Sequence, residues 1–234
     1  MTTTPACRFC ATPLTHTFVD LGPTPLANAY VTPEDVAAGR DKAFSLHARV
    51  CSNCFLVQVD DSVPPDAIFS DYLYFSSYSD SWVEHARQYA VAMKERFALG
   101  PDSLVVEIAS NDGYLLQHFK AMGVPVHGVE PAANVAKAAE AKGIATTVAF
   151  FGEASAKALA AQGKSADLMA ANNVLAHVPG TLDFASGFAT LLKPEGVATF
   201  EFPHVLNLIK DVQFDTIYHE SLLQNSSGDS PAWG

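Results

Sequence analysis

The stretch of sequence that decides the fold is VVEIASNDG, residues 105–113. Its first four residues are mostly apolar and are typical of a buried strand, and the Ser-Asn-Asp-Gly that follows is typical of a tight turn. Gly113 allows the backbone to approach a ligand closely, and Asn111 or Asp112 suits the start of a helix. Ligands of open parallel sheets bind beyond the carboxyl ends of the strands, so we expect a ligand site at this turn.

Around this stretch the chain alternates strands with helices. We expect strands at residues 104–109, 126–129, 145–150, 167–171 and 196–202, and helices at 112–122, 132–142, 153–161 and 181–192. Helical crossovers between strands favour a parallel sheet with helices on both faces. An earlier helix is expected over residues 79–97, because apolar residues recur there at spacings of three and four: Trp82, Ala86, Tyr89, Met93 and Phe97. The sequence therefore predicts an α/β fold with about five parallel strands.

The residues at the expected rim of this sheet favour an adenosine-type ligand. The turn contains one glycine, whereas a dinucleotide site would normally present G-x-G-x-x-G. Glu130 follows the second strand, where a carboxylate can accept both hydrogen bonds of a ribose diol, although an acidic residue there can equally be plain surface. Asn172, Asn173 and His177 follow the fourth strand at the same rim. For His177, a structural role in capping or packing remains the alternative.

All four cysteines lie before residue 55, in two C-x-x-C pairs: Cys7 with Cys10, and Cys51 with Cys54. Two such pairs can supply four thiolates to one tetrahedral zinc ion, and four protein ligands leave no open position for catalysis. Redox or disulfide pairs are the alternative. A structural zinc ion would also explain how a turn-rich segment with little core of its own could fold.

Composition sets the remaining expectations. A net charge of −11 in 234 residues, with only 14 Lys and Arg, argues against a nucleic-acid partner. No long apolar segment or basic leader is evident, so we expect a cytoplasmic protein that does not bind membranes. The expected organisation is a zinc-binding domain (1–62), a helical connector with active-site aromatics (63–100), a cofactor-binding domain (101–220) and a disordered tail (221–234).

The motifs together resemble the sugar C-methyltransferase family. The resemblance rests on the paired cysteines, on Glu107 through Gly113, on Asn173 through Pro179, and on Phe214 through Glu220. It implies a Rossmann-like class I methyltransferase domain that uses S-adenosylmethionine, preceded by a small zinc-ribbon-like domain. The implied substrate is a nucleotide-linked keto-deoxysugar of the dTDP type, methylated on carbon.

The resemblance also implies site residues. The cofactor would be held by residues of the first turn and of two later strand ends: Glu107, Ala109, Asn111, Asp112, Gly113, Glu130, Asn172 and Asn173. The catalytic residues would be Tyr72, His177, Tyr218 and Glu220, and the zinc ligands the four cysteines. In such enzymes a base removes the proton beside the sugar ketone, and the enolate then attacks the methyl group on the sulfonium.

The sequence departs from this family in three ways. The second histidine of the family's Tyr-His-Glu-His pattern, its best candidate base, is replaced by Ser221, and His219 cannot be assumed to substitute for it. Ala109 stands where the family usually has glycine. Finally, the chain ends 32 residues after Phe202, from which we expect a truncated or frameshifted, inactive member with an open sheet edge prone to self-association.

Two other functions remain open from the sequence. One is a noncatalytic protein that keeps the cofactor and zinc sites but lacks a base. The other is a methyltransferase that acts on a small molecule other than a sugar, because only the family resemblance names the sugar.

Overall fold

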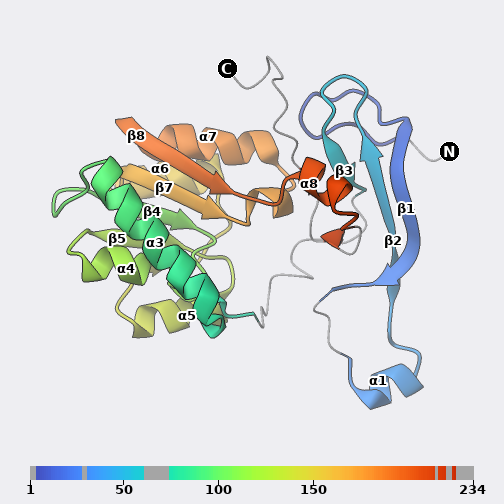
Figure 1. Ribbon diagram of the computed structural model, residues 1–234, viewed down its shortest axis with the longest axis horizontal. Helices are drawn as coiled ribbons and strands as arrows, with labels where there is room; N and C mark the ends of the chain where they lie inside the picture. The colour runs from blue at the N-terminus through green and yellow to red at the C-terminus, as the bar shows by residue number, and fades with distance from the viewer. Residues whose placement is uncertain (1–3, 28–30, 61–73, 214–215, 220–222, 225–234) are drawn as a thin grey trace. The chain divides into compact units, whose positions relative to one another are not determined.

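A computed structural model describes residues 4–27, 31–60, 74–213, 216–219 and 223–224. The chain forms two compact units (Figure 1). One unit comprises Phe69–Val174 and Leu182–Glu201, and we call it the sheet unit. The other comprises Met1–Ile68, Leu175–Thr181 and Phe202–Gly234, and we call it the cysteine unit.

The sheet unit is built on five parallel strands, as predicted. The strands are β4 (Val105–Ile108), β5 (Val126–Val129), β6 (Thr146–Thr147), β7 (Ala166–Asn172) and β8 (Leu192–Glu201). They lie in the order β6-β5-β4-β7-β8, and every neighbouring pair is parallel. The chain moves outward from β4 to β6 and then returns to the other side of β4. The point of reversal lies between β4 and β7, where open parallel sheets bind ligands.

Helices cover this sheet and bury its apolar residues. They are α3 (Asp80–Arg96), α4 (Leu116–Ala121), α5 (Ala133–Ala141), α6 (Glu153–Ala161) and α7 (Thr181–Leu191). Figure 1 shows α3 lying across one face of the sheet. Its predicted apolar face is confirmed: Ala86 is buried in the main core, and the other four residues of the pattern pack against that core. Burial of this face stabilises α3 more than helix propensity does.

Three element bounds differ from the predictions. The helix expected at residue 112 begins only at Leu116, because Asn111 and Gly113 have φ of 50° and 78°, outside the helical range. The strand expected over residues 145–150 is limited to β6, the edge strand of the sheet. The last strand begins earlier than expected, at Leu192, directly after α7.

Among the described residues, β8 pairs only with β7. The other edge of β8 therefore has no strand partner in this part of the chain. Unpaired strand edges favour association with other chains. Self-association through this edge stays a prediction.

The cysteine unit contains an antiparallel sheet. Its strands are β1 (His16–Pro25), β2 (Ala43–Val50), β3 (Val57–Val59) and β9 (Leu223–Gln224), in that order. Two helices accompany them, α1 (Pro33–Ala37), capped by Thr32, and α8 (Val205–Lys210). The core combines residues of β2 and β3 with two from the end of the chain: Leu46, Ala48, Val57, Val59, Val205 and Ile217.

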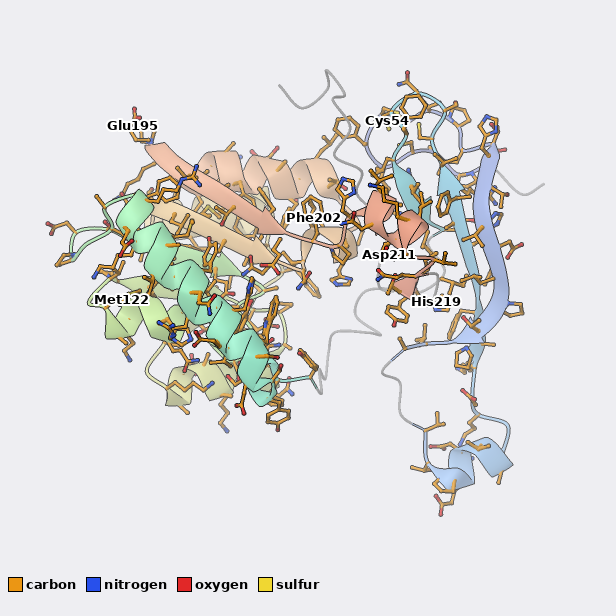
Figure 2. All side chains as sticks on the ribbon, viewed as in Figure 1. Cys54, Met122, Glu195, Phe202, Asp211 and His219 are labelled. Atoms are coloured by element: carbon orange, nitrogen blue, oxygen red, sulfur yellow. The ribbon has the colours of Figure 1, made fainter. Side chains whose placement is uncertain are left out.

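This core explains why the units differ from the expected domain boundaries. Val205 and Ile217, which lie within the expected cofactor-binding domain, are buried against β2 and β3. His219 Nε2 lies 3.0 Å from the Phe44 carbonyl oxygen, and Figure 2 labels His219 in this part of the chain. Two residues of the expected disordered tail form β9, which pairs with β3. The rest of that tail lies outside the described residues.

In the part of the chain that the structure describes, no helix is long and apolar enough to cross a membrane.

Candidate cofactor site and metal centre

The turn after β4 has an unusual backbone. Ala109, Asn111 and Gly113 all have positive φ, of 54°, 50° and 78°. At Gly113 a Cβ would also press on Cδ1 of the buried Ile144, so a side chain there would displace part of the core. Ala109 lacks the conformational freedom of glycine. A non-glycine residue with positive φ costs about 1 kcal/mol of stability. The turn therefore stores a small strain at Ala109.

Glu107 is fully buried at the end of β4, with a relative exposure of 0%. Among the described residues neither of its carboxylate oxygens has a hydrogen-bond partner of ordinary geometry. Burial raises its pKa well above the usual range, the Tyr114 hydroxyl acts to lower it, and the charges of Glu130 and Asp112 raise it further. Buried oxygens without partners are rare in proteins. A ligand that donates hydrogen bonds, such as an ammonium or hydroxyl group, would satisfy them.

Glu130 connects the end of β5 to the turn after β4. Its Oε2 accepts a hydrogen bond from Asn111 N at 2.9 Å, and its Oε1 accepts one from Ala132 N at 2.8 Å. Burial raises its pKa, while these two backbone donors lower it. A carboxylate has about four acceptor positions, so each oxygen can still accept one more bond. The geometry is compatible with the predicted ribose contact.

The side chains of Asn111 and Asp112 bond to protein groups. Asn111 Oδ1 accepts from Ser76 N at 2.9 Å, and Asn111 Nδ2 donates to the Tyr74 carbonyl oxygen at 3.1 Å. Asp112 Oδ2 accepts from Lys142 Nζ at 3.0 Å. Lys142 Nζ also donates to Ser77 Oγ at 2.8 Å. Both side chains therefore link the turn to other segments of the sheet unit.

The two asparagines after β7 have different environments. Asn172 pairs in register with Glu201 of β8, and its Nδ2 lies 3.5 Å from the Tyr114 hydroxyl. Asn173 has φ of 54°, is exposed, and donates its backbone N–H to the Glu201 carbonyl oxygen at 2.6 Å. Through Tyr114, Asn172 is thus connected to Glu107. The structure brings five predicted cofactor residues together at this rim: Glu107, Asn111, Asp112, Gly113 and Glu130.

The predicted catalytic residues fall outside this group. Tyr72 and Glu220 lie outside the described residues. His177 is half-buried in the short 3-10 helix η2 (Leu175–His177), and Tyr218 is exposed; both belong to the cysteine unit. His219 is 4% exposed, and its Nε2 donates a hydrogen bond to the Phe44 carbonyl oxygen. This contact ties His219 to β2.

Two features of the site were missed in the sequence. Tyr114 is 3% exposed and places a hydroxyl beside Glu107 and Asn172. Its position directly after Gly113 was the available signal. Lys142, at the end of α5, is paired with Asp112 across 30 residues of sequence, and no local pattern announces such a long-range ion pair.

The four cysteine sulfurs form one cluster in the cysteine unit. All four Sγ atoms lie within 4.8 Å of one another, and neighbouring pairs are 3.5 to 3.6 Å apart. Zinc–sulfur bonds of 2.3 Å in a tetrahedron place sulfurs about 3.8 Å apart, so the cluster fits a zinc ion. Cys54, labelled in Figure 2, comes from the loop before β3. The cysteines remain free thiols in this geometry, which rules against the disulfide alternative here.

Gln58 of β3 hydrogen-bonds to this cluster and was not predicted from the sequence. It is 1% exposed, its Nε2 donates to Cys7 Sγ at 3.2 Å, and its Oε1 accepts from Arg8 N at 3.0 Å. Arg8 also donates to the Val59 carbonyl oxygen at 3.0 Å. Hydrogen bonds to ligand sulfurs orient them and offset the negative charge of four thiolates. The only local signal was a polar residue inside an apolar strand.

Two family profiles match this chain. Residues 82–228 match a family profile described as "Methyltransferase domain", which covers the turn after β4 and the whole parallel sheet. The chain belongs to the S-adenosylmethionine-dependent methyltransferase family. Residues 7–69 match a second profile, described as "Putative zinc binding domain", which contains the four cysteines. The predicted fold, methyl donor and structural zinc of this methyltransferase are thereby confirmed.

A curated relative of this methyltransferase is the C-methyltransferase NovU of Streptomyces niveus, with 35% identity over 222 residues. The alignment covers 95% of this chain and 53% of NovU, so the chain spans about half the length of that relative. Solved structures with similar folds include the CcbJ methyltransferase of Streptomyces caelestis, with 20% identity and a TM-score of 0.41. That match covers 49% of this chain and 47% of CcbJ. DesVI of Streptomyces venezuelae has 16% identity and a TM-score of 0.41, covering 52% and 51%.

Proposed function

We propose that this methyltransferase transfers a methyl group from S-adenosylmethionine to a carbon of a nucleotide-linked keto-deoxysugar. The observation that carries the proposal is the rim after β4 and β5, where the buried carboxylates of Glu107 and Glu130 lie beside the turn that contains Gly113. The identity to a C-methyltransferase over 222 residues supports carbon as the acceptor atom. The sugar and its dTDP carrier rest on the family resemblance of the motifs.

The sheet unit would supply the donor site. When bound there, the sulfonium compound supplies an electrophilic methyl group and leaves as the neutral thioether. Glu130 would accept hydrogen bonds from the ribose hydroxyls through its free acceptor positions. Glu107, whose buried oxygens have no hydrogen-bond partner of ordinary geometry among the described residues, would accept hydrogen bonds from the polar end of the donor. Gly113 permits the positive φ that this turn requires.

The acceptor chemistry needs a base. A base takes the proton from the carbon beside the ketone, the C–H electron pair forms the enolate, and the new C–C bond forms as the S–CH₃ bond breaks. His177 is our candidate, because the resemblance implies a catalytic role for this half-buried residue and an imidazole ring can accept a proton. Tyr218 would donate a hydrogen bond to the enolate oxygen. Tyr72 and Glu220 would also be catalytic residues, as the resemblance implies.

The proposal is tested by separating donor binding, proton removal and methyl transfer. Calorimetry with S-adenosylhomocysteine measures binding, deuterium wash-in beside the ketone of a dTDP-linked keto-deoxysugar measures the base, and mass spectrometry measures methylation. We expect all three signals, with His177→Ala abolishing wash-in while binding persists. Binding without wash-in or methylation in the unaltered chain would favour the noncatalytic reading. Methylation of small keto compounds but not of the nucleotide sugar would favour a non-sugar substrate.

A further inference from the structure

Asn111 ties the cofactor turn to a short segment far from it in sequence. This segment, residues 74–78, contains the 3-10 helix η1 (Ser76–Tyr78) and leads into α3, whose N-cap is Ser79. We call it the strap. Ser76, at its centre, is 7% exposed, and its backbone N–H donates to Asn111 Oδ1 at 2.9 Å. The Tyr74 carbonyl oxygen accepts from Asn111 Nδ2 at 3.1 Å. One amide side chain therefore satisfies both a donor and an acceptor of the strap.

The other end of the strap is tied to the same turn by a second link. Lys142 Nζ donates to Ser77 Oγ at 2.8 Å and to Asp112 Oδ2 at 3.0 Å. Adjacent residues of the turn thus hold adjacent residues of the strap. The Asn111 bonds are the more buried of the two links, because Asn111 is 7% exposed and the Ser77 bond lies at the surface. Less competition from water makes the buried link the stronger one.

Asn111 is also fixed from the cofactor side. Its backbone N–H donates to Glu130 Oε2 at 2.9 Å, and its Oδ1 accepts from Asp112 N at 2.9 Å. Its φ of 50° is the left-handed conformation that asparagine tolerates better than most residues. A ligand on Glu130 or in the turn would therefore act on the residue that holds the strap. With its amide already bonded to the strap, Asn111 is poorly placed to use that group on the cofactor.

We infer that Asn111 is a positioning residue whose amide clamps the strap to the cofactor turn, so that bound donor and ordered strap stabilise each other. This inference rests on the proposed donor site. Because the coupling is reciprocal, the loss of donor affinity on releasing the strap cannot exceed the factor by which saturating donor lowers the equilibrium population of the open strap. If Asn111 only supported the fold, the loss of donor affinity would not be limited by the protection that donor gives to the strap.

Hydrogen exchange of the backbone amides tests the clamp directly. In the chain without ligand, Asn111→Ala leaves the Ser76 amide without its acceptor, and we expect that amide to exchange about tenfold faster. An unchanged rate at Ser76 overturns the clamp whether or not any cofactor binds. In the unaltered chain, S-adenosylhomocysteine should slow exchange in both the turn, residues 110–113, and the strap. Protection of the turn alone would overturn the coupling.

A second variant leaves the turn untouched in case Asn111→Ala folds poorly. Ser76→Pro removes the donor N–H at the first position of η1, where proline is tolerated, and the preceding Phe75 is already extended, with φ of −105° and ψ of 118°. The matched control is Ser77→Ala, which loses only the Lys142 contact. We expect S-adenosylhomocysteine to protect residues 110–113 in all three variants, but to protect the strap only in the control.

The affinity measurement completes the test. By calorimetry, the Kd for S-adenosylhomocysteine should rise in Ser76→Pro, by no more than the protection factor measured for the strap in the unaltered chain. A larger rise, or strap protection that persists in Ser76→Pro, would contradict the inference. If S-adenosylhomocysteine does not bind the unaltered chain at all, the proposed function fails, and the clamp is still decided by the ligand-free exchange at Ser76.

Discussion

Asn111 donates its backbone N–H to Glu130 at 2.9 Å, which joins the turn after β4 to the end of β5. The two residues are 19 positions apart, and each belongs to a different strand end of the parallel sheet. The contact brings the predicted ribose carboxylate to the predicted cofactor turn. Glu130 therefore has two roles: it accepts backbone hydrogen bonds that stabilise the fold, and it would bind the ribose in the proposed donor site.

Replacing Glu130 by Gln should therefore reduce both stability and donor binding. A Gln side chain can accept from only one of the two backbone donors at Asn111 and Ala132, and its own N–H₂ group opposes the other. We expect the free energy of unfolding to fall by about 1 to 2 kcal/mol. Affinity for S-adenosylhomocysteine should fall by about tenfold or more, because one ribose bond to a charged acceptor is lost. Urea unfolding and calorimetry measure the two effects.

The control for that variant is Glu140→Gln on α5, an exposed carboxylate. It removes the same charge without touching the rim, so neither quantity should change appreciably. Equal loss of affinity in both variants would mean that net charge, and not the Glu130 contact, governs donor binding.

Glu107 should make stability depend on pH. Burial raises its pKa in the folded chain, so the folded state holds a proton that the unfolded state has released. Its stabilising effect is thus present below the unfolded pKa of about 4.3, and is lost as the pH rises toward the folded pKa. Glu107→Gln mimics the protonated form. We expect this variant to be more stable than the unaltered chain at pH 8, by on the order of 1 kcal/mol or more, with the difference shrinking toward pH 4.

Urea unfolding of the two zinc-loaded proteins between pH 5 and pH 8 measures this difference. Comparing the variant with the parent cancels the acid sensitivity of the thiolates, which both share. A difference that is constant across this range would mean that Glu107 has the same protonation state in the folded and unfolded chains.

Ala109 should be improved by glycine. Its φ of 54° places the methyl group against the following carbonyl, and glycine removes that cost. Removing this contact should raise the free energy of unfolding of Ala109→Gly by about 1 kcal/mol. The greater freedom of glycine in the unfolded chain offsets part of that gain. Affinity for S-adenosylhomocysteine should be kept or improved, because the turn becomes easier to form.

Ala98→Gly provides the matched control for Ala109→Gly. Ala98 follows α3 with φ of 50°, and it is exposed and outside the cofactor rim. It should gain similar stability in thermal unfolding but leave donor binding unchanged. If Ala109→Gly instead weakened donor binding, the methyl group of Ala109 would be a ligand contact.

The zinc site should depend on Gln58. Gln58→Met keeps the volume of the buried side chain but removes the hydrogen bond to Cys7 Sγ. Loss of such an outer contact typically weakens metal binding by 10- to 100-fold, so we expect about a tenfold faster loss of zinc to a competing chelator. A chromophoric chelator follows the release, and exposed Gln162→Met serves as control. Equal zinc retention in both variants would exclude a role for Gln58 in the site.

The sequence by itself determined the parallel sheet, the helix face of α3 and the metal cluster. Each depends on a local repeat: apolar runs of strand length, a spacing of three and four, and two C-x-x-C pairs. It also placed Glu107, Gly113 and Glu130 at one rim, because the carboxyl ends of parallel strands share an edge. These features need only periodicity and chain order.

Only the tertiary structure decided which groups those residues meet. The bonds of Asn111 to Ser76, of Lys142 to Asp112 and of Gln58 to Cys7 join positions 30 or more residues apart. The placement of Val205 and Ile217 beneath β2 and β3 likewise follows from packing across most of the chain. Such contacts form because buried polar groups need hydrogen-bond partners and buried apolar side chains need close packing. The partners come from distant parts of the chain, so no local sequence pattern predicts them.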